Sequence, residues 1–231
     1  MKRTLFLLAL IAAGVAFDKG LWTVPREWNP FAPLYIKDAI TPVTGWKLKR
    51  LEHDRQSCLT ALATWPDGNL EYQALADYTP IQSCPLTNVV RLNATGVRFN
   101  RSFVATCPLA LDWLMFEYHR LQPAARKMLG SPVSRVEHYG SFACRNIYGR
   151  ENARRSAHAS AEALDVAAFT LQDGRRISVL DDWPSDGRKG QWLRNIQRGA
   201  CRSFSTVLGP DYNAAHANHF HVAVGGFNVC R

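Results

Sequence analysis

The chain has 231 residues, of which 47% are hydrophobic and 20% are charged, and its formal net charge is +9. This content of apolar and aromatic residues excludes a disordered chain, and the length suits one domain with a sizeable core and a small appendage. The basic residues are scattered and form no basic helix, so we expect no nucleic acid as a partner; an anionic cell envelope accounts for the charge equally well.

The N-terminus has the pattern of an export signal. Residues 1–3 include two basic side chains, and residues 4–17 form an almost unbroken apolar run. This run is shorter than the roughly 20 residues that a spanning helix needs, and it matches the apolar region of a signal peptide. Cleavage after Ala16 would release the chain, whereas an uncleaved segment would anchor it in the inner membrane with Trp22 at the interface. We therefore assign residues 1–20 to a signal peptide or N-terminal membrane anchor and expect a periplasmic protein.

The proline-rich stretch that follows leads into regular structure. Residues 21–46 carry four prolines and are predicted to be an extended tether, so the folded domain is expected to cover residues 47–231. Apolar residues at spacings of three and four predict helices at residues 54–65 and 108–121. Residues 89–104 are strand-like.

The C-terminal half combines strands with one helix. Residues 133–139 alternate like a strand, and residues 164–171 and 177–180 form a predicted hairpin around an Asp-Gly turn. An amphipathic helix is predicted at residues 189–201 and a final strand at residues 219–224. Because helices and antiparallel strands are segregated along the chain, we predict an α+β fold, a small antiparallel sheet with helices packed on it.

Six cysteines indicate disulfide bonds. They are Cys58, Cys84, Cys107, Cys144, Cys201 and Cys230, and none has the close spacing of a zinc finger. An even number in an exported chain predicts disulfides, with about 15 possible pairings. We favour Cys201 with Cys230, because both flank the last predicted strand. Six buried free thiols in a cytosolic protein are the alternative, which the N-terminus disfavours.

Two short motifs are predicted to meet at one metal ion. On a strand, His219 and His221 face the same side of the sheet. Asp165 lies in an apolar strand, where a carboxylate is costly to bury unless it is paired or binds a metal. With His158 from the preceding loop, one aspartate and two histidines would form a three-ligand zinc set that leaves a fourth position for water. The alternative is that each is an ordinary packing or ion-pair residue.

The residues around these motifs resemble a known group of zinc enzymes. The pattern Ser156-x-His158-x-x-Ala161-x-Ala163-x-Asp165, followed by His219-x-His221, is similar to the signature of the zinc D-Ala-D-Ala peptidases, murein endopeptidase and the hedgehog signalling domain. More closely, residues from about 47 to the end resemble the extensin-like C-terminal domain of bacterial exported proteins. The stretches that carry this closer match are YGSFACRN, SAHASAEALDVAAF, ISVLDDW, GACRSFSTVLGPDYNAAH and HFHV.

The resemblance implies a role for each motif residue. Three of them are the implied ligands of one zinc ion per chain: His158, Asp165 and His221. His219 is the implied general base, and His216 matches a further active-site histidine. Ser156 falls where a hydroxyl lies near the substrate, and Arg145 is implied to stabilise the oxyanion or hold a carboxylate. The chain departs from the peptidase signature at Ala161, which replaces a glycine, at Asn218, where aspartate is expected, and in lacking an ExxH glutamate base.

Three functions are weighed for this site. The first is an exported zinc-dependent peptidase or amidase that cleaves peptidoglycan stem peptides by zinc-activated water. The second is a non-catalytic envelope-binding module that keeps the zinc-peptidase fold, and the third is a disulfide-stapled domain without metal. The expected partners are peptidoglycan or muropeptides, together with the inner membrane if the N-terminal segment stays uncleaved.

Overall fold

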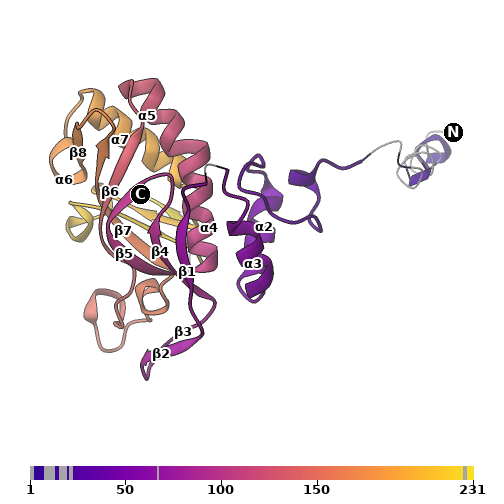
Figure 1. Ribbon diagram of the computed structural model, residues 1–231, viewed down its shortest axis with the longest axis horizontal. Coiled ribbons are helices and arrows are strands. Elements are labelled where there is room, and N and C mark those ends of the chain that lie inside the picture. Colours follow the sequence, from indigo (N-terminus) through magenta and orange to yellow (C-terminus); the bar gives the residue numbers. More distant parts are fainter. Residues whose placement is uncertain (1–2, 8–13, 16–19, 21–22, 67, 226–227) are drawn as a thin grey trace.

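The computed structural model describes residues 3–7, 14–15, 20, 23–66, 68–225 and 228–231 (Figure 1). The predicted apolar run at residues 4–17 lies partly outside these residues, and the predicted cleavage position at Ala16 and the interfacial Trp22 lie wholly outside them. Among the described residues, no helix combines the length and the apolar character that a membrane crossing requires.

A mixed sheet, nine-stranded over the described residues, forms the centre of the fold. The strand order is β1-β4-β5-β6-β7-β10-β9-β11, and β8 pairs with β7 beside this path. The bounds are β1 Glu71–Ala74, β4 Val89–Ala94, β5 Arg98–Thr106, β6 Val133–Gly140, β7 Ala163–Leu171, β8 Arg176–Ser178, β9 Thr206–Leu208, β10 Phe220–Ala223 and β11 Val229–Cys230. A separate hairpin of β2 (Tyr78–Ile81) and β3 (Cys84–Leu86) projects from the body at the bottom of Figure 1.

The sheet confirms the α+β class and corrects its predicted form. It is larger than predicted and not purely antiparallel, because β5 pairs parallel with β6, and β9 with β11. Two parallel neighbours need a crossover connection, and the helical segment at residues 107–129 supplies it between β5 and β6. The strands β1, β9 and β11 have four, three and two residues, which is too short for an alternating pattern to reveal them.

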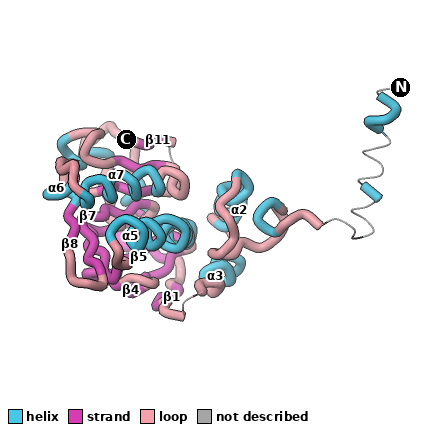
Figure 2. Tube along the Cα trace, turned by 90° about the horizontal axis from the view of Figure 1, so that it is seen from above, coloured by secondary structure: helices cyan, strands magenta, loops and turns pink. Residues whose placement is uncertain are grey.

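Three helices lie together against the sheet: α4 (Cys107–Phe116), α5 (Gln122–Leu129) and α7 (Arg188–Ala200) (Figures 1 and 2). The helical region predicted at residues 108–121 extends further, because the π-helical turn η2 (Glu117–Leu121) carries α4 into α5. The helix predicted at residues 189–201 is α7, which buries Trp192, Leu193 and Ile196. Short 3-10 turns are also present: η1 Arg26–Trp28, η3 Ile147–Gly149, η4 Ala157–Ser160 and η5 Ala214–His216.

Two predicted strands are divided in the structure. Residues 89–104 fall on β4 and β5, which form a hairpin whose turn contains Gly96. A Cβ added at Gly96 would collide with the Glu117 carboxylate, so a larger residue here would displace that side chain. Residues 177–180 divide between β8 and the short helix α6 (Val179–Asp182), because the Ser178 hydroxyl caps that helix. The predicted hairpin of β7 and β8 is confirmed.

Three disulfides tie the outer segments to the core: Cys58–Cys107, Cys84–Cys144 and Cys201–Cys230. The last is the pairing favoured from the sequence. No described cysteine is free, which fits an exported protein in an oxidising compartment.

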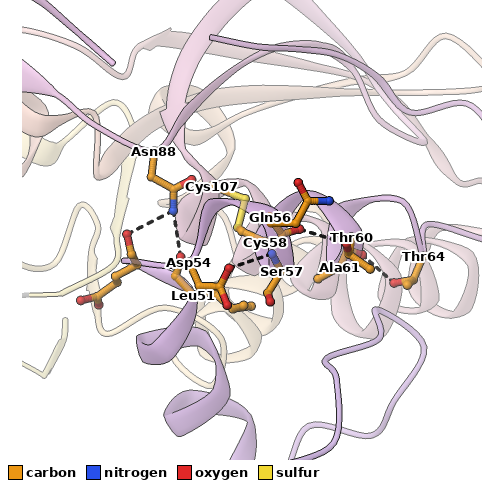
Figure 3. Close-up of a disulfide and its surroundings, with 11 residues drawn as sticks. Leu51, Asp54, Gln56, Ser57, Cys58, Thr60, Ala61, Thr64, Asn88 and Cys107 are labelled. Atoms are coloured by element: carbon orange, nitrogen blue, oxygen red, sulfur yellow. Dashed lines mark hydrogen bonds between the residues drawn. A yellow bond between two sulfur atoms is a disulfide. The ribbon is translucent and has the colours of Figure 1, made fainter. Parts of the chain in front are cut away.

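The helices α2 (Pro42–Leu51) and α3 (Arg55–Leu62) form a small unit beside α4. Figure 3 shows two of its connections. Cys58 of α3 is bonded to Cys107 at the start of α4, and the side-chain amide of Asn88 donates to the Leu51 carbonyl at 2.8 Å. α3 lies within the helix predicted at residues 54–65.

The stretch predicted as a tether, residues 21–46, contacts the same unit. Its side chains Leu34 and Ile36 are buried. The Ile36 N–H donates to the Thr64 hydroxyl at 3.0 Å, and the ring of His119 donates to the Ile36 carbonyl at 2.8 Å. The segment is therefore packed against the domain at these points.

Candidate metal centre

Two neighbouring strands place Asp165 and His221 opposite each other. They are direct cross-strand partners in the antiparallel β7–β10 pair. The residues on either side of each are buried in the core, so strand alternation turns both side chains to the other face of the sheet. On the opposite side of Asp165, β6 contributes Gly140, which has no side chain to fill the site.

His158 reaches the same point from the turn before β7. It lies in η4, and the Ser156 hydroxyl caps this turn by accepting from the His158 N–H at 3.3 Å. Ala161 ends the turn with a left-handed φ of 57°, a conformation that costs a residue with a Cβ about 1–2 kcal/mol. Ala161 stands where the resembling peptidases have glycine, and here the alanine takes the conformation that glycine favours.

The three predicted ligands converge. Asp165 Oδ1 lies 2.9 Å from His221 Nδ1 and 3.2 Å from His158 Nε2, and the two ring nitrogens are 3.2 Å apart. Two ligand atoms of a tetrahedral zinc ion lie about 3.3 Å apart when the bonds to the metal are about 2.0–2.1 Å. Both the spacing and the donor set therefore fit zinc.

A backbone contact determines which nitrogen of His158 faces the centre. The Nδ1–H of His158 donates to the Ser141 carbonyl at 3.0 Å. With its proton on Nδ1, the ring turns Nε2 toward the Asp165 carboxylate and His221, the orientation that a metal ligand needs. A cation at this point, either a metal ion or a proton, would offset the repulsion between these electron-rich atoms. A bond from the opposite ring nitrogen to a carbonyl is also typical of metal-bound histidine.

Two further histidines flank this cluster. His219 Nε2 lies 3.6 Å from Asp165 Oδ1, and the ring of His216 is 5.2 Å from that of His219. An asparagine orients each ring: the Nδ1–H of His219 donates to Asn218 Oδ1, and that of His216 to Asn213 Oδ1, both at 2.8 Å. Nε2 of each neutral ring is therefore free to accept a proton.

Burial and mutual contact shift the pKa values in the cluster. Burial by itself raises the pKa of Asp165, but hydrogen bonds with His158 and His221 outweigh it, and the pKa lies well below its ordinary value. Burial lowers the pKa of His219, against the attraction of Asp165. Burial, aided by charge on neighbouring histidines, lowers the pKa of His216 to about 4. At pH 7 the carboxylate is thus ionised, while His216 and His219 are neutral.

The residues of this cluster lie in a region that matches a known protein family. The family described as extensin-like protein C-terminus matches residues 56–231. The chain belongs to this family. The matched region contains every residue of the cluster, whereas α2 and the residues before it lie outside the match. No curated protein and no solved structure matches the chain.

Two further predicted site residues of this extensin-like domain precede His158 in the chain. Arg145 is exposed, and its backbone carbonyl accepts from the Ser156 N–H at 3.1 Å. Among the described residues, no hydrogen bond or ion pair joins its guanidinium to the histidines. Ser156 is half-buried, and its hydroxyl caps the turn that carries His158.

Three exposed tyrosines of the extensin-like domain surround the histidines, and no pattern in the sequence singles them out. The ring of Tyr139, at the end of β6, lies 5.6 Å from that of His219, and the ring of Tyr212 lies 5.4 Å from that of His216. The Tyr148 hydroxyl accepts at 2.8 Å from the asparagine that orients His216. The three rings come from separate segments and meet only in the fold.

The sequence patterns also did not predict the contacts that orient the histidine rings. Asn218 directly precedes His219 and Asn213 lies three residues before His216, a spacing visible in the sequence. Ser141 acts through its carbonyl, which no side-chain pattern reveals.

Proposed function

We propose that this extensin-like domain is a zinc-dependent hydrolase that cleaves amide bonds in the peptide stems of peptidoglycan. The observation that carries the proposal is the convergence of donor atoms from His158, Asp165 and His221 within 3.2 Å of one another. The likeness of the motifs to the zinc D-Ala-D-Ala peptidases and murein endopeptidase supports the reaction class and a shared fold. The three disulfides support an exported protein, which would meet the cell wall.

In this proposal His158, Asp165 and His221 hold the metal. Bound zinc would lower the pKa of a water toward about 7 and polarise the amide carbonyl. The role of His219 is to take the proton of the attacking water and return it to the leaving amine. Three properties support this role: its Nε2 is proton-free at pH 7, Asn218 orients the ring, and the nitrogen lies 3.6 Å from Asp165 Oδ1.

His216 has a different role in this scheme. Its pKa of about 4 keeps the ring neutral, so it adds no positive charge beside His219. Its Nε2 is an acceptor for an N–H of the substrate, because Asn213 already holds the proton on Nδ1. The same asparagine bonds Tyr148, so the ring, the tyrosine and the loop between them form one connected wall of the site.

The surroundings support an anionic polymer as the substrate. The loop beside the site carries four exposed arginines: Arg145, Arg150, Arg154 and Arg155. Guanidinium groups bind carboxylates, which stem peptides carry. Arg145 remains the candidate for holding a substrate carboxylate or the oxyanion. The exposed rings of Tyr139, Tyr148 and Tyr212 offer flat apolar surfaces to a peptide or a sugar.

Metal analysis and turnover together test the proposal. Protein purified without chelator or histidine tag is expected to contain one zinc per chain. Mass spectrometry of muropeptides is expected to show cleavage by the wild type and none by His219→Ala, which should keep its zinc. Stoichiometric zinc without cleavage of any wall fragment would refute the hydrolase.

A non-catalytic envelope-binding module is the second candidate. The missing glutamate base favours it, because proton transfer then depends on a histidine alone. This candidate expects binding to purified sacculi that is equal for wild type and His219→Ala, with no soluble product from either.

A further inference from the structure

The segment before the family match displays an exposed aromatic surface. Four ring side chains of residues 23–50 are exposed: Trp28 by 53%, Phe31 by 82%, Tyr35 by 37% and Trp46 by 44%. Exposed apolar groups of this size, gathered on one segment, mark an interaction site. We call these four rings, with the exposed cations of residues 23–50, the aromatic face.

Side-chain contacts hold parts of the aromatic face in place. The rings of Phe31 and Trp46 meet edge to face at 6.2 Å. Arg26 forms an ion pair with Asp38, and the ammonium of Lys47 donates to the Arg26 carbonyl at 2.7 Å. Because the fold already orders this segment, a partner binds it without a large loss of conformational entropy.

The charge of the aromatic face has one sign. The exposed charged side chains of residues 23–50 are all cations: Arg26, Lys37, Lys49 and Arg50. The two acidic side chains of this stretch are less exposed: Asp38 is buried in its ion pair, and Glu27 is half-buried. The guanidinium of Arg50 lies 4.8 Å from the centre of the Trp46 ring, so cation and ring are presented together.

A hollow accompanies the rings. A cavity of about 280 Å³ lies between residues 30–35 and the helices α2 and α3, and its lining includes Phe31, Tyr35 and Arg50. Its lining combines apolar side chains with Arg50 and with Asp54, whose carboxylate accepts from the Ser57 N–H at 3.0 Å, so the hollow offers a mixed wall beside the rings.

We propose that the aromatic face docks on the surface of a membrane that contains anionic lipids. Aromatic rings favour the boundary between headgroups and acyl chains, and cations beside them attract anionic headgroups. A second copy of the chain fits less well, because two faces of the same positive charge repel each other. The described segment that begins at residue 23 lies on the side of α2 and α3, away from β8 and α6 (Figures 1 and 2), and residues 4–17 are apolar in sequence. Docking needs no helix that crosses the membrane and does not depend on the proposed hydrolase activity.

The test needs a local readout, since the apolar residues 4–17 can bind lipid by themselves. The full chain is added to phosphatidylcholine vesicles with or without one quarter phosphatidylglycerol, and hydrogen exchange of residues 23–50 is followed by mass spectrometry. We expect exchange there to slow at least severalfold on the anionic vesicles, and less on phosphatidylcholine alone. The double variant Phe31→Ser/Trp46→Ser should lose this protection. The variant Leu180→Ser, which removes an exposed apolar side chain of α6, should keep it.

A second variant separates charge from folding defects. Lys49→Gln/Arg50→Gln leaves the rings in place and should weaken docking on anionic vesicles about fivefold for each cation removed. Three results would overturn the proposal: equal exchange with and without vesicles, equal protection on both lipid compositions, or protection in concentrated protein without lipid, which would indicate self-association.

Discussion

The Nδ1–H of His158 donates to the backbone carbonyl of Ser141 at 3.0 Å, and this bond directs Nε2 to the point where Asp165 and His221 meet. Ser141 directly follows β6 and His158 lies just before β7. Because β6 and β7 pair antiparallel, the end of one and the start of the other are neighbours, with Gly140 opposite Asp165. The sheet and this backbone bond thus fix the orientation of His158, one of the three proposed ligands.

The first prediction concerns the ligands. His158→Ala and Asp165→Asn each remove one of three converging donors, so zinc affinity should fall by more than the roughly 10–100-fold typical of losing an outer contact. Competition with a chromogenic chelator measures it. His219→Ala is the control, since its ring is not among the three converging ligands and affinity should stay within a few-fold. Tight zinc binding by Asp165→Asn would place the metal elsewhere.

The second prediction concerns the orientation of His219. Asn218→Ala removes the acceptor of the Nδ1–H bond, so the ring can turn and the proton can move to Nε2. We expect kcat/KM on muropeptides to fall about 10–100-fold with zinc content unchanged. Asn218→Asp keeps an acceptor and should retain activity. Equal loss in both variants would show that Asn218 matters for packing rather than for the proton.

The sequence suggested the three proposed metal ligands, but it could not give the orientation of their side chains. Asp165 in an apolar strand and two histidines at a spacing of two already imply a shared face, because strand side chains alternate. The register that sets His221 opposite Asp165 and the carbonyl of Ser141 behind His158 depend on pairing between distant segments. The size of the sheet could not be predicted for a related reason. Strands as short as β9 and β11 form only because a neighbouring strand offers hydrogen bonds.

The third prediction concerns the disulfide nearest the metal centre. Cys84–Cys144 joins the β2–β3 hairpin to the stretch after Ser141, and the Ala143 N–H donates to the His158 carbonyl at 3.0 Å. Replacing both cysteines by serine should lower the free energy of unfolding by about 2–4 kcal/mol and also weaken zinc binding, because the support of His158 loosens. Denaturant unfolding and chelator competition measure the two effects.

A matched variant separates local from global effects of that disulfide. Cys201→Ser/Cys230→Ser should lose stability similarly, since that bond joins α7 to β11 on the far side of β9 from the ligands. Its zinc affinity should match the wild type. If both double variants bound zinc equally weakly, the Cys84–Cys144 bond would have no special relation to the metal centre.

The last prediction concerns a buried acid away from the metal centre. Asp112 in α4 is buried, and burial holds the pKa of its carboxyl well above the ordinary value. Its folded state keeps the proton at pH values where the unfolded chain has lost it, so stability falls as the pH rises from about 3.9 to the folded pKa and is constant above. An asparagine side chain in its place cannot ionise. Asp112→Asn should therefore have a higher free energy of unfolding than the wild type at pH 8. The difference should be about 1.4 kcal/mol for each pKa unit by which folding raises the pKa of Asp112, and it should vanish below about pH 3.9. Urea unfolding at several pH values measures this, with Asp181→Asn as a control that makes the same substitution at an exposed site. A variant less stable than the wild type at pH 8 would mean that Asp112 is ionised and paired in the folded protein.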